Sequence, residues 1–410
     1  MFPLFALSAV FLLIAVRQVG GFRLPMWQVM CGGAAAVLLS GDIGPSAALA
    51  SIDPEVMLFL FGMFAAGQVM ELSGWLAHAE YEVFKRARTE AGLLLTLVFV
   101  MGLASALLMN DTLAIAGTPV ALLLARKHRI ATKPLLLALA FSITIGSVMS
   151  PIGNPQNLLV AVKGGVQAPF LTFLRHLAVP TLLNLFAVFL VVRHFYRGEF
   201  GPEALSHSQE PVRDAALARL ARITAWTLLT AIAAKVLLVT IDPRLDFRLT
   251  WIALAAAAPG LLFSPRRFEI LRRLDWGTLA FFAGMFVLTR SAWDTGFFQG
   301  LLARAGAAAA GTGPVMIVSV LLSQLISNVP LVALYLPVLT RAGAGTPELM
   351  ALAAASTFAG NLFVLGAASN VIIISAAERK SGETVTFLEF ARVGVPLTVI
   401  NAIIYWLFLR

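Results

Sequence analysis

Long apolar stretches, separated by short clusters of basic residues, dominate this sequence. Ten of them are long enough, or nearly so, to cross a lipid bilayer as a helix, which takes about 20 apolar residues. They cover approximately residues 3–16, 24–39, 56–76, 134–162, 174–192, 223–241, 250–263, 276–291, 347–376 and 390–409. Nearly every such stretch must face lipid or another apolar stretch, so we predict an all-α polytopic membrane protein.

The composition agrees with this prediction. Hydrophobic residues make up 59% of the chain and charged residues 12%, about half of the share usual in soluble domains. The net charge of +9 would suit a nucleic-acid ligand, but the basic residues lie between apolar stretches, which is the pattern that encodes membrane topology. We therefore expect a lipid bilayer, and no nucleic acid, as partner. The single cysteine, Cys31, can form no internal disulfide or Cys-based metal site.

The distribution of basic residues predicts the orientation in the membrane. Of the 30 Lys and Arg residues, the ten spans place 21 on one side and seven on the other, while Lys235 and Arg290 fall within or near spans. The positive-inside rule makes the basic side cytoplasmic and puts both termini outside the cytoplasm. We expect a multi-pass protein of the cell inner (plasma) membrane. Lys235 and Arg290 are expected to be interfacial charges, with Asp294 or solvent as partner.

Two further apolar segments do not fit single spans. Residues 92–125 are broken at MNDT (109–112), and residues 314–339 are broken at SNVP (327–330). The arm after each break has about 12 to 15 residues, short of the roughly 17 to 25 that a crossing helix needs. We therefore predict two re-entrant helical hairpins with their tips at membrane depth.

The two halves of the chain repeat one another. Residues 58–75 align with residues 280–297 through a shared Gly-Met-Phe, and the two hairpins share Ser, Asn and Pro at identical spacing. A Gly-x-x-x-Asn follows each hairpin. Because each half has five spans, an odd number, the second copy enters the membrane in the opposite direction to the first. This is the inverted-repeat arrangement of secondary transporters.

This repeat predicts the organisation of the whole chain. We expect a first inverted repeat over residues 1–195, a cytoplasmic linker over residues 196–222 and a second inverted repeat over residues 223–410. Each repeat is predicted to contain five transmembrane helices, of which one is broken, and one re-entrant hairpin.

The most irregular segment is SPIGNPQN, residues 150–157. Pro151 and Pro155 each remove a helical hydrogen bond, and Gly153 allows backbone conformations that other residues avoid. Unpaired backbone groups cost several kcal/mol in lipid and survive only where protein, water or an ion satisfies them. The sequence therefore predicts a polar site at this break.

The equivalent segment of the second half, GAASNV, has no prolines. It keeps Gly366, Ser369 and Asn370, so we expect a polar site there with a milder break.

The hairpin tips supply the other wall of the predicted site. Asn110 or Asp111 can cap the helix after the first break, and Asn328 can cap the helix after the second. An ionised Asp111 would cancel the positive end of its helix, and its equivalent in the second half is Val329. We therefore predict cation or proton coupling in the first half, and substrate polarity set by the second.

Three segments carry a family resemblance: PIGNPQNLL from Pro151, SQLISNVPLVALYLPV from Ser323, and residues 359–390. They resemble the ion transporter superfamily and, within it, the arsenite permease and sodium/proton antiporter branch. The resemblance covers essentially the whole chain. It implies a scaffold part, a moving part that holds both hairpins and both broken helices, elevator-like movement and a homodimer.

The resemblance and the repeat together assign the site residues. Substrate and coupling ions are expected at Asn110, Asp111, Thr112, Gly153, Asn154, Asn157, Ser327, Asn328, Gly366, Ser369 and Asn370.

Departures from the family patterns bear on the substrate. Dicarboxylate carriers of this superfamily have Ser-Asn-Thr at both tips, whereas this chain has MNDT and SNVP. We therefore favour proton-coupled efflux of arsenite, antimonite or a related small inorganic solute, with Asp111 as coupling residue, over a dicarboxylate or sulfate carrier. The second break lacks the Thr-Pro of many arsenite permeases, which leaves a general inorganic-anion permease equally compatible.

Other functions are weighed against this one. The main alternative is a sodium/proton antiporter, in which Asp111 and broken-helix carbonyls would hold Na⁺. We expect no enzyme, because the five histidines are scattered and no His-Glu-x-x-His occurs. No cofactor is expected beyond Na⁺ or H⁺ as the coupling ion. No Gly-x-x-x-x-Gly-Lys loop occurs, so an ATPase would be a separate partner, and paired hairpins favour alternating access over a channel.

Overall fold

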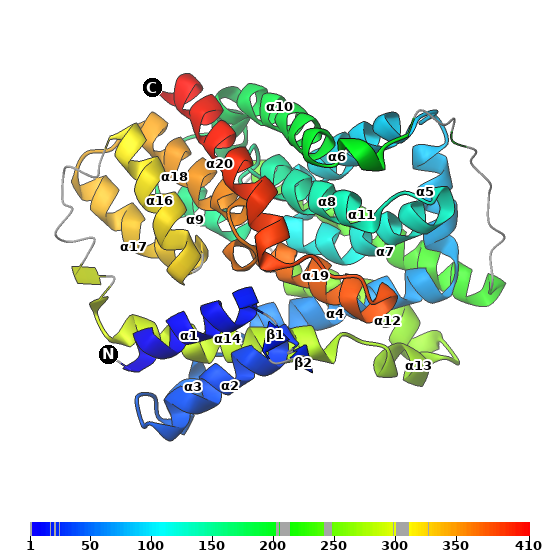
Figure 1. Cartoon of the computed structure of the whole chain (residues 1–410), viewed down its shortest axis with the longest axis horizontal. Coiled ribbons are helices and arrows are strands. Elements are labelled where there is room, and N and C mark those ends of the chain that lie inside the picture. Colours follow the sequence, from blue (N-terminus) through cyan, green and yellow to red (C-terminus); the bar gives the residue numbers. More distant parts are fainter. Residues whose placement is uncertain are drawn as a thin grey trace.

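The computed structural model describes residues 2–16, 18–19, 22–23, 25–201, 205, 214–241, 248–297, 299–300, 311–326 and 328–410. Within these residues the protein is almost entirely helical (Figure 1). A short antiparallel pair, β1 (Gln18–Val19) and β2 (Phe22–Arg23), connects the first two long helices. The predicted all-α class is confirmed.

Helices lie at all ten predicted spans. In the first half they are α1 (Phe2–Val16), α2 (Met26–Leu39), α4 (Pro54–Leu72), α8 (Thr132–Ser147) with α9 (Pro155–Lys163), and α10 (Pro169–Phe195). In the second half they are α11 (Ala215–Ile241), α12 (Leu249–Phe263), α14 (Trp276–Asp294), α18 (Thr346–Phe358) with α19 (Ala368–Ser381), and α20 (Phe387–Leu409). α11 thus begins inside the predicted linker, of which residues 202–204 and 206–213 lie outside the described residues.

Short helices occupy several connections. They are α3 (Pro45–Ser51), α5 (Trp75–Phe84), α13 (Arg267–Arg272) and the 3₁₀ turn η1 (Arg197–Glu199). Among the described residues, five helices are long and apolar enough to cross a bilayer on their own, namely α4, α6 (Glu90–Leu108), α10, α11 and α20. Shorter apolar helices include α1, α2, α8 and α12.

The two predicted hairpins are formed by α6 (Glu90–Leu108) with α7 (Asn110–His128) and by α16 (Thr312–Ile326) with α17 (Asn328–Arg341). α17 has 14 residues, as expected, but α7 has 19 and is longer than predicted. Its last turn is the basic segment 126–128, which the negative end of a helix favours. The helix therefore continues beyond its apolar residues.

Helices from the two halves pack in matching pairs. α2 packs against α14 as α12 packs against α4, α7 against α19 as α17 against α9, and α6 against α8 as α16 against α18. α10 and α20 pack against each other and lie together at the top of Figure 1. Each pairing recurs with the halves exchanged, as expected for a chain built from two structural repeats.

This packing separates two groups of helices. We call α1, α2, α4, α11, α12 and α14 the scaffold group, and both hairpins with both broken helices the hairpin group. In Figure 1, α1, α2 and α14 lie together at the lower left, away from α16 and α18.

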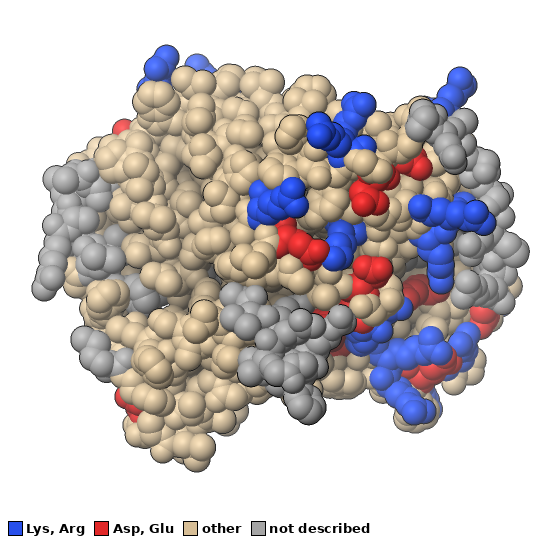
Figure 2. All heavy atoms as spheres, in the orientation of Figure 1, with Lys and Arg blue, Asp and Glu red and all other residues tan. Residues whose placement is uncertain are grey.

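Charge is unevenly distributed over the surface. On the face shown in Figure 2, Lys and Arg gather at the end that carries α5, α13 and the last turn of α19, whereas both chain termini lie at the opposite end (Figures 1 and 2). Two ion pairs at the basic end join the groups: Lys380 of α19 pairs with Glu71 of α4, and Arg379 pairs with Asp275 at the start of α14 at 3.2 Å.

The expectation for Arg290 is confirmed, but that for Lys235 is wrong. Arg290 pairs with Asp294 at 2.9 Å, and both side chains are about half exposed. Lys235 is only 2% exposed. α11 continues to Ile241, so Lys235 lies more than a turn inside the helix, where α4 and α12 cover it.

Candidate functional site

The first break separates α8 from α9 at residues 148–154. The side-chain amide nitrogen of Asn157, Nδ2, donates to the backbone carbonyls of Ser147 (3.1 Å), Val148 (3.2 Å) and Ser150 (3.0 Å). The Ser147 carbonyl is the one that Pro151 cannot pair. The Asn157 side chain therefore donates a hydrogen bond to the carbonyl that Pro151 leaves without a helical partner.

Two further residues shape this break. The Asn154 side chain caps α9 by accepting from the Asn157 N–H at 2.9 Å. A Cβ at Gly153 would overlap the Ser147 carbonyl, so only glycine fits there. The break is a compact polar fold of the backbone.

Thr357, near the end of α18, joins the first break from the other half of the chain. Its hydroxyl accepts from the amides of Asn154 (3.1 Å) and Gln156 (3.4 Å) and is 3.1 Å from the acceptor Asn157 Oδ1. Thr357 also lies 2.8 Å from the Ala353 carbonyl, so its single proton is shared between two acceptors. The two breaks therefore lie next to each other.

Removing the Thr357 hydroxyl should destabilise the protein. Thr357→Val leaves two buried amide groups short of a partner, each worth about 1–3 kcal/mol, so we expect the free energy of unfolding to fall by about 2 kcal/mol. Thermal unfolding in detergent micelles measures this, with Thr357→Ser as the variant that keeps the hydroxyl. If the Val and Ser variants unfolded at the same temperature, the hydrogen bonds of the Thr357 hydroxyl would not stabilise the protein.

The first hairpin tip lies on the first break. The Asn110 N–H donates to the Gly153 carbonyl at 3.2 Å, and Met109, which connects the arms, has a φ of 58°. Asn110 and Thr112 are 6% and 3% exposed. Asp111 Oδ1 is buried and has no hydrogen-bond partner in the described part of the chain.

The predicted side-chain caps are not seen at this tip. α7 begins at Asn110, so Asn110 is already helical and its side chain accepts only from the N–H of Asp111, at 2.9 Å. Asn328 is likewise the first residue of α17. A cap at Asn110 or Asn328 would have placed the helix start one residue later than observed, and a cap at Asp111 two residues later.

The second break lies between α18 and α19 and consists of the 3₁₀ turns η4 (Ala359–Asn361) and η5 (Val364–Gly366). The Asn370 amide donates to the Gly360 carbonyl at 2.7 Å, ten residues earlier, as Asn157 does to Ser147. The predicted break is present although this segment has no proline, because two 3₁₀ turns interrupt the helix over residues 359–366.

Polar atoms at the second break and tip lack partners. Buried side-chain oxygens without a hydrogen bond to any described residue are Ser323 Oγ, Gln324 Oε1, Asn328 Oδ1, Asn361 Oδ1, Ser369 Oγ and Asn370 Oδ1. Buried polar groups are normally paired, so such a cluster indicates a place for water, an ion or a solute. No group of three or more His, Cys, Asp or Glu that could hold a metal occurs among the residues described.

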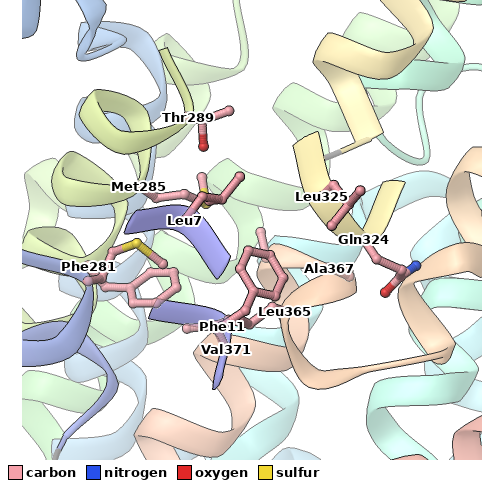
Figure 3. Close-up of a pocket in the computed structure, with 12 residues that line it drawn as sticks. Leu7, Phe11, Phe281, Met285, Thr289, Gln324, Leu325, Leu365, Ala367 and Val371 are labelled. Atoms are coloured by element: carbon pink, nitrogen blue, oxygen red, sulfur yellow. The ribbon is translucent and has the colours of Figure 1, made fainter. Parts of the chain in front are cut away.

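Two small cavities separate the hairpin group from the scaffold group. One, of about 40 Å³, lies beside the second hairpin (Figure 3), and the other, of about 10 Å³, lies beside the first. Their walls correspond in pairs between the halves: Leu7 and Leu228, Phe11 and Ile232, Met30 and Ile252, Phe281 and Phe59, Met285 and Met63, Leu365 and Ile152. The polar residues outside these pairs are Thr289 and Gln324 in the larger cavity, and Thr112 and Lys235 in the smaller one.

The structure thus groups the predicted site residues into two neighbouring clusters. The first contains Asn110, Asp111, Thr112, Gly153, Asn154 and Asn157, and the second contains Gly366, Ser369 and Asn370, while Asn328 begins α17 at the second tip. Ser327 lies outside the described residues. Sequence reasoning missed Ser147, Thr357 and Gln324, although Thr357 matches Thr144 in the repeat, and each donates to the carbonyl four residues earlier.

Two groups of membrane helices that meet at paired hairpins and broken helices are an arrangement typical of membrane transporters. The family model described as citrate transporter, CitMHS, matches residues 9–355, and the chain belongs to this family. The resemblance to the ion transporter superfamily is thereby confirmed. The protein is a multi-pass membrane transporter and not an enzyme.

Known relatives cover most of the chain. The 46 kDa membrane protein of Mycobacterium leprae is 30% identical, over 85% of this chain and 84% of that protein. An uncharacterized transporter of Mycobacterium tuberculosis is 32% identical, over 87% and 86%. The silicon efflux transporter LSI3 of Oryza sativa subsp. japonica is 27% identical, over 90% and 89%. The YdaH transporter structure from Alcanivorax borkumensis, 16% identical, covers 100% of this chain and 96% of its own with a TM-score of 0.48.

Proposed function

We propose that this protein is a secondary active exporter of arsenite, antimonite or a related inorganic solute, which it exchanges for protons by an elevator-type movement of the hairpin group. The observation that carries the proposal is the set of unpaired oxygens at the second break, beside a first tip that bears one carboxylic acid, Asp111. The first cluster would take the coupling proton, and the second would take the solute.

The chemistry of the unpaired atoms favours a neutral hydroxylated solute. They are amide carbonyl oxygens and hydroxyls, whereas the Asn370 amide N–H is engaged by Gly360. Such oxygens accept from the O–H groups of arsenic trihydroxide. Citrate, after which the family is described, carries carboxylates, which the acceptor-only amide oxygens repel. The name of the rice relative, a silicon efflux transporter, also points to an inorganic solute.

The same oxygens would suit a partly dehydrated sodium ion, which keeps a sodium/proton antiporter as the second candidate. In either case we assign the basic end of the protein to the cytoplasm, which leaves both termini outside in a plasma membrane. A homodimer that holds the scaffold groups still while the hairpin groups move is part of the proposal.

Arsenite accumulation in everted membrane vesicles tests the function. With an imposed proton gradient we expect uptake that collapses when the gradient is dissipated and that is missing from vesicles without the protein. If arsenite does not accumulate and added sodium instead dissipates the proton gradient, the protein is a sodium/proton antiporter and the exporter proposal fails.

A further inference from the structure

We propose that Gln324 determines solute specificity at the second break by presenting a fixed hydrogen-bond acceptor to a solute O–H group. This inference rests on the proposed function and names the residue that recognises the solute. Gln324 lies on α16, three residues before the second tip, and is 8% exposed. It forms part of the wall of the 40 Å³ cavity, opposite Leu7 and Phe281 of the scaffold group (Figure 3).

The orientation of the Gln324 amide is fixed by its neighbours. Its nitrogen donates to the carbonyls of Val320 at 3.0 Å and Ala359 at 2.8 Å, so both N–H groups are used. A flipped amide would place its oxygen against two carbonyl oxygens, which repel it. Oε1 must therefore point away from both carbonyls.

That oxygen points into the second break. A Cβ at Gly366 would lie 2.8 Å from Gln324 Oε1 and 3.0 Å from the Ala359 carbonyl, so glycine leaves room for this oxygen. Oε1 is buried and has no partner among the described residues. A buried acceptor held in place without a partner is costly, and a bound O–H donor would remove that cost.

The repeat separates this role from a purely structural one. The hairpins align with a shift of 218 residues, which pairs Ser105 with Ser323 and Ala106 with Gln324. Ala106 is buried and offers no acceptor. Only the second half therefore has this side-chain acceptor, and it is also the half in which the other oxygens at the break are unpaired.

The chemical consequence is a preference by hydrogen-bonding type. The Gln324 oxygen, unlike a serine hydroxyl, can only accept, so it favours a neutral solute that donates an O–H group and repels an oxyanion at this position. A site built to pair with a solute hydroxyl discriminates strongly against a solute that lacks one.

Binding to the purified protein tests the inference apart from transport. We would measure thermal stabilisation by sodium arsenite, sodium citrate and sodium chloride for wild type, Gln324→Met and the matched control Leu325→Met, which changes the same cavity without removing an oxygen. Arsenite should stabilise wild type and Leu325→Met at matched sodium, citrate should not, and Gln324→Met should raise the half-saturating arsenite concentration by about tenfold, the effect of one lost hydrogen bond. Gly366→Ala, which displaces Oε1 but keeps the glutamine, should do the same.

The outcomes separate this inference from the proposed function. Stabilisation by arsenite that Gln324→Met leaves unchanged, stabilisation by citrate, or a sodium effect that depends on Gln324 would each overturn the assignment. Arsenite binding that depends on Gln324 without proton-driven uptake in vesicles would support the assignment and overturn the exporter proposal.

Discussion

Asp111→Asn should lower proton-driven accumulation of solute by about 100-fold, towards the upper end of the usual range of coupling free energies. Asp111 is the only ionisable residue in segments 109–112, 148–157, 328–330 and 359–370, which form the tips and breaks. Asparagine keeps the shape of the side chain but cannot take up a proton. Slow downhill movement of solute should persist, because the oxygens of the second break are unchanged.

The accumulation ratio at several imposed pH gradients measures this effect. Asp294→Asn is the matched control, since Asp294 pairs with Arg290 on the exposed end of α14 and should leave coupling intact. If Asp111→Asn accumulated solute to the same ratio as wild type at every pH gradient, Asp111 would not be the coupling residue.

Gly146→Val should destabilise the folded protein by about 3 kcal/mol or more. A Cβ at Gly146 would overlap the backbone of Gly102, so α6 and α8 cross with their backbones in direct contact. Small residues at such crossings allow membrane helices to approach closely, and a β-branched side chain would force the first hairpin away from the first broken helix.

Thermal unfolding and the yield of monodisperse protein measure the cost. Gly32→Val is a suitable control, because nothing lies within 4 Å of a Cβ at Gly32. If Gly146→Val unfolded at the same temperature as wild type, the close crossing of α6 and α8 would be absent from the native protein.

The sequence predicted the helices and their interruptions well, for a physical reason. A membrane helix needs a long apolar stretch, and the polar breaks of MNDT, SPIGNPQN and SNVP stand out in such a chain. The helix lengths were harder to predict, because the basic end of α7 adds a turn outside the apolar pattern, and the second break forms 3₁₀ turns without proline.

The partners inside the site could not be predicted from local patterns. Asn154 and Thr357 are 203 residues apart, and only the packing of α18 beside the first break brings them together. Whether a buried amide is satisfied depends on such contacts, so the sequence favoured the first break as the polar site. The structure instead shows that the side-chain amides of the first break are paired with backbone carbonyls and with the hydroxyls of Ser147 and Thr357, while the second break keeps unpaired oxygens.

Proton movement driven by solute in proteoliposomes of the purified protein tests the central claim most directly. An arsenite gradient, imposed without sodium or any other ion gradient, should drive protons in the opposite direction in wild type, and Asp111→Asn should abolish this flux. An arsenite gradient that moves no protons, with a sodium gradient moving them instead, would contradict the account.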